Sequence, residues 1–140
     1  MAEPVVLGAA VATRGNDLLM MRTDPGVTEG CWSVPSVAVA GGETLVEAVV
    51  RAVRERCSLT ALAAPLLGWY ESIEHGVAGA VAGHYVVACY RTVVLDDSEP
   101  APGPGAVEAR WMPVWDVAEL PLVDGLAQLL ADHQVIDTIA

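Results

Sequence analysis

The chain has 140 residues, 54% of them hydrophobic, and its 18 Asp+Glu outnumber its 7 Lys+Arg to give a formal net charge of −11. This length predicts that residues 1–140 form a single domain, and the acidic balance without a basic patch argues against a nucleic-acid partner. The sequence has no apolar run long enough to span a membrane and no charged-then-apolar leader, so we expect a cytoplasmic protein with no membrane partner.

The first forty residues predict a β-hairpin followed by a further strand. The hairpin strands are expected over residues 5–13 and 18–23, joined by the turn Arg14-Gly15-Asn16-Asp17. A loop over residues 24–30 then leads into an alternating strand that continues to residue 40.

The segment 44–57 predicts an amphipathic helix. Thr44 followed three residues later by Glu47 is a capping box, which places the start of the helix at Thr44. A wide apolar face recurs at helical spacing: Leu45, Val46, Val49, Val50, Val53 and Cys57. On the other side, the spacing of Glu47, Arg51 and Glu55 allows a ladder of ion pairs, with a merely solvated charged face as the alternative.

Arg56 occupies an unusual position on this helix. At about 100° per residue, it projects between Leu45 and Val49, at the edge of the apolar face. A charge at such an edge needs a partner, an anionic ligand or a route to solvent. Either the side chain extends outward from the last turn, where it complements the helix dipole, or it finds a partner in the protein or a ligand.

The second half of the chain predicts strands and then helices. One or two strands are expected over residues 61–73, and one strand over each of residues 84–95 and 108–112. The Gly- and Ala-rich segment 74–83 predicts a mobile connection, and residues 96–105 predict a loop rich in proline and acids.

Two helices are expected at the end, over residues 113–120 and 122–134. Apolar residues at helical spacing mark the last of them: Leu122, Leu126, Leu129, Leu130, Val135 and Ile136. We expect this face to pack against the sheet, with a homodimer contact as the alternative.

The predicted helix and the turn before it resemble a Nudix box, whose pattern is G-x5-E-x7-R-E-U-x-E-E-x-G-U with U a bulky aliphatic residue. The matching positions are Glu43, Arg51, Val53, Glu55 and Leu59. The departures are Val37 for the first Gly, Ala52 and Arg56 for two of the Glu residues, and Ser58 for the last Gly.

The resemblance extends on both sides of the box. Trp32-Ser33-Val34-Pro35 is similar to the W-x-L-P of this family, with Ser36-Val37 in place of its paired glycines. Residues 108–113 followed by Glu119-Leu120 resemble the closing E-x-x-W-x-P and E-L motifs, so that the match spans roughly residues 4–120.

The resemblance implies an α/β fold: an α/β/α sandwich with a mixed sheet, the box helix on one side and the C-terminal helices on the other. It also implies a hydrolase of nucleoside diphosphates linked to another group, with Mg²⁺ or Mn²⁺ as the cofactor. Carried over to this chain, Glu55 is the remaining helical metal ligand and forms the catalytic set with Arg51 and Glu43. Arg51 either orients Glu55 or pairs with Glu43. Any further acid would come from outside the helix: Glu71, Glu74, Asp96, Asp97, Glu99 or Glu108.

The departures from the pattern bear on the cation. In the family, the two lost Glu positions lie four residues apart on one helix face and supply carboxylates to the metal. Here that face carries Ala52 and Arg56, and one remaining carboxylate beside a guanidinium makes a poor site for a hard cation. We therefore expect metal-dependent hydrolysis to be impaired or altered.

Two other functions remain open. The first is a regulatory module that binds a nucleotide or another phosphorylated metabolite without a cofactor, in which Arg56 with Arg51 or Arg54 holds the phosphate. The second is a structural protein without a small ligand. Trp32 is a candidate for stacking a base if it lines an open cleft together with Tyr70.

Overall fold

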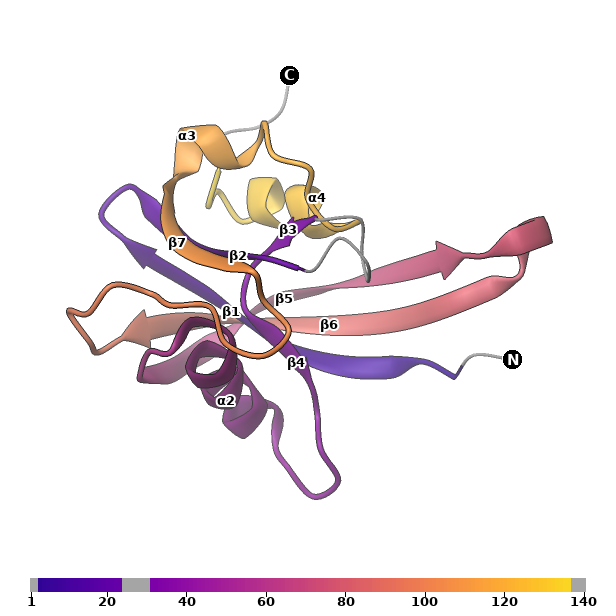
Figure 1. Cartoon of the computed structure of the whole chain (residues 1–140), viewed down its shortest axis with the longest axis horizontal. Coiled ribbons are helices and arrows are strands. Elements are labelled where there is room, and N and C mark those ends of the chain that lie inside the picture. The colour runs from indigo at the N-terminus through magenta and orange to yellow at the C-terminus, as the bar shows by residue number, and fades with distance from the viewer. Residues whose placement is uncertain (1–2, 24–30, 137–140) are drawn as a thin grey trace.

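The computed structural model describes residues 3–23 and 31–136 of the chain. The loop expected over residues 24–30 lies outside these described residues. A twisted seven-stranded sheet runs through the molecule, and helices lie on both of its sides (Figure 1). Within the described ranges, no helix is both long enough and apolar enough to cross a bilayer.

The sheet is mixed, as the resemblance implied. Its strands in chain order are β1 (Val5–Arg14), β2 (Asp17–Arg22), β3 (Trp32–Ser33), β4 (Ser36–Ala38), β5 (Ala61–His75), β6 (Val81–Val94) and β7 (Glu108–Pro113). The main path is β3-β2-β1-β6-β5, with β4 paired to β1 and β7 paired to β2. Among the described pairs, β1 and β6 run parallel and the others run antiparallel. This pairing brings the start of the chain beside a strand from its middle.

The helices cover the two sides of the sheet unequally. Helix α2 (Leu45–Cys57) lies on one side, and α3 (Val114–Val117) and α4 (Leu126–Asp132) lie on the other (Figure 1). Side chains of the C-terminal segment enter the larger core cluster, as expected for packing against the sheet: Leu126, Leu129, Leu130 and Ile136. Both C-terminal helices are shorter than predicted. Helix α4 begins only after Gly125, whose φ of 90° is incompatible with a right-handed helix.

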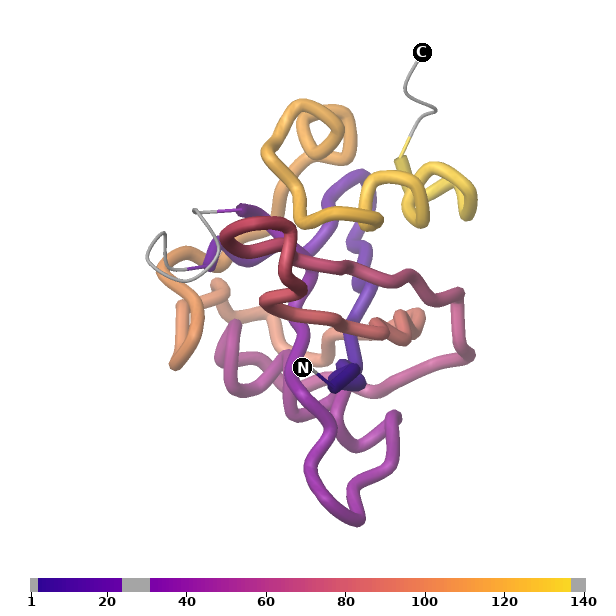
Figure 2. Tube along the Cα trace, turned by 90° about the vertical axis from the view of Figure 1, so that its right-hand side faces the viewer, coloured from indigo at the N-terminus to yellow at the C-terminus, as the bar shows by residue number. Residues whose placement is uncertain are grey.

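The β5–β6 hairpin departs most from the sequence prediction. Half of the segment expected to be a mobile connection is strand, because Glu74 pairs with Gly83 and His75 pairs with Val81 around a 3-10 turn at Val77–Gly79. The strand register shifts on either side of Leu66, just after Pro65, a residue that cannot donate to the ladder. The hairpin extends well beyond the helices in Figure 1, and its turn faces the viewer in Figure 2.

Helix α2 begins and ends as its local sequence dictates. Thr44 accepts the backbone N–H of Glu47, and the Glu47 carboxylate accepts the backbone N–H of Thr44, so the predicted capping box is confirmed. The same carboxylate also accepts a hydrogen bond from the Thr44 hydroxyl. Of the expected ladder, the described residues show the ion pair between Arg51 and Glu55. At the other end, Ser58 adopts a left-handed φ of 61°, at the position where the family pattern has Gly.

Candidate functional site

Arg51 organises the charged side of α2. Its Nε and Nη2 donate to the two carboxylate oxygens of Glu43, both at 2.8 Å, and its Nη1 donates to Glu55 at 3.0 Å. Nη2 also donates to the carbonyl of Ala38 at 2.7 Å. The hydrogen bonds from Arg51, and then that from the backbone N–H of Ala40, lower the pKa of Glu43 to about 2. Arg51 thus both pairs with Glu43 and holds Glu55, and the three residues expected to act together do meet.

Arg56 does not extend into solvent. Its Nε donates to the carbonyl oxygen of Ser36 at 3.1 Å, and its Nη1 donates to the carbonyl oxygen of Pro104. The half-buried side chain therefore lies between strand β4 and the loop that precedes β7. Of the two alternatives for this edge position, the structure has the one in which the guanidinium finds a partner in the protein.

Two other departures from the Nudix box, Val37 and Ala52, meet in an apolar contact. Val37, Ala48 and Ala52 form one buried cluster, with exposed fractions of 2%, 0% and 0%. Val37 and Ala52 stand where the family pattern has Gly and Glu. The two departures are neighbours in space, and the valine side chain occupies the room beside the small Ala52.

These residues do not fit the divalent cation that the resemblance implies. Hard cations need several oxygen ligands, and the described residues contain no grouping of three or more Asp, Glu, His or Cys side chains suited to a metal. Both oxygens of Glu43 are engaged by Arg51, and Glu55 is bonded to the same guanidinium. Arg56, whose Nε donates to the carbonyl of Ser36, adds a positive charge to the helix that supplies metal ligands in the family.

Three of the six candidate acids outside the helix, Glu71, Asp96 and Glu108, are engaged elsewhere. Glu71 lies 2.9 Å from a ring nitrogen of His84, and Glu108 lies 2.7 Å from Nη2 of Arg22. The Asp96 carboxylate accepts a backbone N–H at 2.7 Å. These contacts leave no described acid gathered around Glu55 to complete a cation site.

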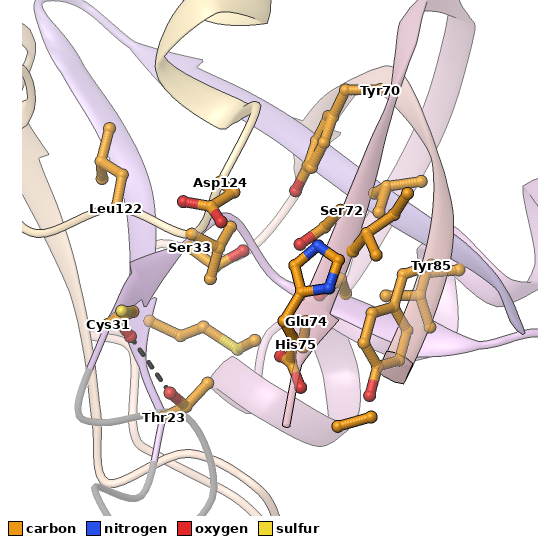
Figure 3. A pocket seen from close by; sticks show the side chains of 17 residues that line it. Thr23, Cys31, Ser33, Tyr70, Ser72, Glu74, His75, Tyr85, Leu122 and Asp124 are labelled. Atoms are coloured by element: carbon orange, nitrogen blue, oxygen red, sulfur yellow. Dashed lines mark hydrogen bonds between the residues drawn. The ribbon is translucent and has the colours of Figure 1, made fainter. Parts of the chain in front are cut away.

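A cleft of about 610 Å³ opens between the β5–β6 hairpin and the segment before α4. Tyr70, Ser72 and Tyr85 of the hairpin face Ser33 and Asp124 across it (Figure 3). Burial raises the pKa of the Tyr70 hydroxyl above its ordinary value, so this group remains a neutral hydrogen-bond donor at physiological pH. The cleft has the size of a small-molecule site.

Ser36 connects the cleft with α2. It is one of the cleft-lining residues, and its carbonyl oxygen accepts the Nε of Arg56. Arg56 itself is not among the residues that line the cleft.

The structure separates the other candidate ligand-binding residues. Trp32 is 8% exposed, belongs to the core cluster and is not among the residues that line the cleft, whereas Tyr70 does line it. Arg54 is exposed on α2. Sequence reasoning did not identify Ser72 or Tyr85, which carry no motif; their pairing across the hairpin is the signal that they share a face.

Comparison with known proteins agrees with the resemblance to the Nudix family. The sequence profile of the NUDIX domain matches residues 3–133. The chain belongs to the Nudix family. Its sequence is 28% identical over 134 residues to the ADP-ribose pyrophosphatase of Methanocaldococcus jannaschii, covering 96% of this chain and 71% of that protein.

Solved structures confirm the Nudix fold. A NUDIX hydrolase from Nitrosomonas europaea superposes with a TM-score of 0.77 at 20% identity, over 94% of this chain and 89% of that one. The NUDIX domain of Shewanella oneidensis NrtR, solved with ADP ribose, gives a TM-score of 0.73 at 17% identity, over 96% of this chain and 88% of that one. The predicted α/β/α arrangement around a mixed sheet is thereby confirmed.

Proposed function

We propose that this Nudix-family protein binds a nucleoside diphosphate linked to another group in the cleft, that it does so without a divalent cation, and that its hydrolytic activity is impaired. The observation that carries the proposal is the position of Arg56, whose guanidinium donates to the carbonyl of Ser36, a residue that lines the cleft. Where the family pattern places a carboxylate for the metal, this chain places a positive charge.

The ligand class follows from the cleft and from the relatives. Tyrosine rings, serine hydroxyls and the carboxylates of Glu74 and Asp124 line the cleft. The tyrosine rings suit stacking of a base, and the hydroxyls and carboxylates suit hydrogen bonding to sugar hydroxyls. A sequence relative is named for its action on ADP-ribose, and a protein of the same fold has been solved with ADP ribose. ADP-ribose is therefore the probe of choice for this class.

Impaired hydrolysis follows from the donor set around α2. Attack of water on phosphorus requires the charge on the phosphate oxygens to be neutralised and the water to be held. Glu55 and Glu43 are both bonded to Arg51, and Ala52 offers no carboxylate. Loss of the groups that hold a catalytic metal costs orders of magnitude in affinity or rate.

Hydrolysis is the second candidate function, favoured by the relationship to an ADP-ribose pyrophosphatase. The two functions differ in their need for a cation. We would titrate the protein with ADP-ribose by calorimetry in Mg²⁺ and in excess EDTA, and measure AMP release in parallel. The proposal expects binding in both buffers and no turnover. Turnover that requires Mg²⁺ would support hydrolysis instead, and absence of binding in both buffers would contradict both functions.

A further inference from the structure

We infer that a second pocket, away from the cleft, binds the phosphate group of a small anionic ligand, with Arg91 supplying the positive charge. This pocket has a volume of about 360 Å³ and lies where the β1–β2 turn, strand β6 and the end of α4 meet. We call it the arginine pocket. Strand β1 passes both sites, since Leu7 lines the cleft and Thr13 lines the arginine pocket. The described residues that line the two sites are otherwise different, so the inference is independent of the proposed function.

The arginine pocket is a positive site in an acidic chain. Asp and Glu make up 18 of the 140 residues, and Glu74 and Asp124 line the cleft. No acid is among the described residues that line the arginine pocket. Arg91 lines it and takes part in no ion pair within residues 3–23 and 31–136. An anion that enters this pocket therefore meets a guanidinium that is available for charge-assisted hydrogen bonds.

Strand β6 directs Arg91 toward this pocket. Arg91 pairs with Val11 of β1 and follows Cys89 by two residues, so the three side chains lie on one face of the sheet. Val11 and Cys89 are buried in the core cluster that the residues of α4 also enter. Arg91 is exposed, because it lies further along β6, where this core ends. The cation is thus on the side of the sheet that α4 covers, but outside the apolar core.

Neutral donors surround the charge. The chain has three side-chain amides, those of Asn16, Gln128 and Gln134, and two of them, Asn16 and Gln134, line this pocket. Thr13 adds a hydroxyl, and His133 adds a ring that carries an N–H in either charge state. These donors belong to the β1–β2 turn and the end of α4, so they surround Arg91 from different segments. A tetrahedral phosphate group presents oxygens in several directions, whereas a planar carboxylate presents two.

The end of α4 holds Gln134 in place. The N–H of Val135 donates to the carbonyl of Leu130 at 2.8 Å, and the N–H of Gln134 donates to the carbonyl of Ala131 at 3.1 Å, which is the pattern of a Schellman motif. Gln134 has a φ of 59°, a conformation for which helix ends usually have glycine. The chain therefore keeps a side-chain amide beside the pocket at a position where glycine would fit the backbone more readily.

The His133 ring has a defined place on strand β5. A Cβ on Gly68 would lie 2.7 Å from Nε2 of His133, so the glycine leaves room for the ring against the strand. Gly68 pairs with Cys89, two residues before Arg91 on β6. The imidazole is therefore held near the stretch of β6 that carries the cation.

A first experiment locates the site. Inorganic phosphate is titrated into the ¹⁵N-labelled wild type at an ionic strength held constant with chloride, and the side-chain amide signals are followed by NMR. We expect the Asn16 and Gln134 signals to shift together with a dissociation constant in the millimolar range. Gln128, which donates to Asp132 at 2.7 Å outside the pocket, should stay unmoved. Acetate at the same concentrations should shift the two signals less, and equal shifts would overturn the assignment to phosphate.

A second experiment removes the charge. Arg91→Gln is compared with Arg110→Gln, because Arg110 is an exposed arginine on β7 that is not among the residues lining either site. With the Asn16 signal as the readout, we expect Arg91→Gln to weaken phosphate binding at least about tenfold, since charge-assisted hydrogen bonds are the strong ones. Arg110→Gln should leave the affinity unchanged.

A third experiment removes a neutral donor without disturbing the backbone. Gln134→Gly is compared with Ser58→Gly, because Ser58 ends α2 with a similar φ of 61° and glycine suits both positions. We expect Gln134→Gly to weaken phosphate binding by about threefold, as expected for the loss of one hydrogen bond. Ser58→Gly should bind phosphate as the wild type does, and the dispersion of the amide signals shows that each variant is folded.

Three outcomes would overturn the inference. The first is that phosphate leaves the Asn16 and Gln134 signals unmoved, or shifts only cleft residues such as Ser72 and Tyr85. The second is that Arg91→Gln binds phosphate as tightly as the wild type. The third is that Arg110→Gln weakens binding as much as Arg91→Gln, which would show an effect of net charge and not a site. Each result stands whether or not the cleft binds ADP-ribose.

Discussion

Val37 packs in one buried cluster with Ala52, and these are two of the positions at which the chain departs from the Nudix pattern. The pattern has Gly at the first and Glu at the second. Because the two side chains share one small space, the substitutions are linked: a glutamate at 52 would place its carboxylate against the valine. The two substitutions therefore form one alternative apolar packing of the Nudix box and are not two independent losses of family residues.

Because these two side chains are in contact, we predict that their substitutions have non-additive effects on the free energy of unfolding. Ala52→Glu should lower the free energy of unfolding by about 3 kcal/mol, because it buries a carboxylate without a partner. Val37→Gly should lower it by about 2 kcal/mol through lost apolar burial and added chain entropy. We expect the double variant to lose at least about 1 kcal/mol less than the sum of the two, as contacting sites couple. Urea unfolding measures the cycle, and additivity within about 0.5 kcal/mol would contradict the contact.

The contact between Val37 and Ala52 also determines which substitutions are needed to restore a cation site. Arg56→Glu with Ala52→Glu supplies the two missing carboxylates, and adding Val37→Gly makes room for them. We expect the triple variant to bind Mn²⁺ at least about tenfold more tightly than the double variant, since a cation site needs its ligands unstrained. Titration calorimetry with Mn²⁺ compares them. Equal affinity would mean that Val37 does not obstruct the site.

The Glu43–Arg51 pair predicts a pH dependence of stability. The pKa of Glu43 is lowered from 4.5 to about 2, chiefly by hydrogen bonds from Arg51. A lowered pKa means that the carboxylate stabilises the fold above pH 4.5, and that this stabilisation is lost as the pH falls toward 2. In urea unfolding between pH 6 and pH 2, the difference between wild type and Glu43→Gln should shrink as the solution is acidified.

Glu119→Gln is the control for this pH series, because Glu119 is an exposed acid near α3. Its difference from wild type should stay constant over the same pH range. A Glu43→Gln difference that is equally constant would show that the ion pair does not stabilise the fold.

The three cysteines predict a pattern of thiol reactivity. Burial raises the pKa of both Cys57 and Cys89 to about 12, so their thiolate fraction at pH 8 is negligible. Cys31 is half-buried and lines the cleft. With a disulfide reagent at pH 8, we expect one thiol to react in the native protein and two more to react only after unfolding.

Ligand binding should change this pattern at one residue. ADP-ribose in the cleft should slow the native reaction, and a Cys31→Ser variant should lack that reaction altogether. A native reaction that ADP-ribose leaves unaltered would place the ligand away from Cys31.

Local sequence predicted the helix better than it predicted the site. The capping box at Thr44 and the apolar face of α2 depend on residues within a few positions of each other. The capping box is confirmed, and Val49, Val53 and Cys57 of the predicted face are buried. Val46 is exposed instead, and Ala48 and Ala52 complete the buried face. The position of the Arg56 side chain depends on carbonyls 20 and 48 residues away along the chain. Backbone carbonyls are present at every residue, so no sequence pattern marks the two that meet Arg56.

The C-terminal helices and the cleft likewise have features that the local sequence pattern did not predict. Apolar spacing in the last segment correctly predicted packing against the sheet, but helix α4 starts later than its apolar pattern, because Gly125 takes a positive φ. Tyr70 and Tyr85 face the cleft only because β5 and β6 form a long hairpin around the turn at Val77–Gly79. The sequence of that turn, rich in Gly and Ala, had indicated a mobile connection instead.

The central claim is that this protein binds its ligand without a divalent cation. The most direct measurement is the paramagnetic resonance signal of free Mn²⁺ as the wild-type protein is added, with and without ADP-ribose. We expect the free Mn²⁺ signal to stay undiminished at about 100 μM protein, because no described cluster of oxygen ligands can hold the ion. Stoichiometric loss of that signal, reversed by EDTA together with release of ADP-ribose, would contradict the account.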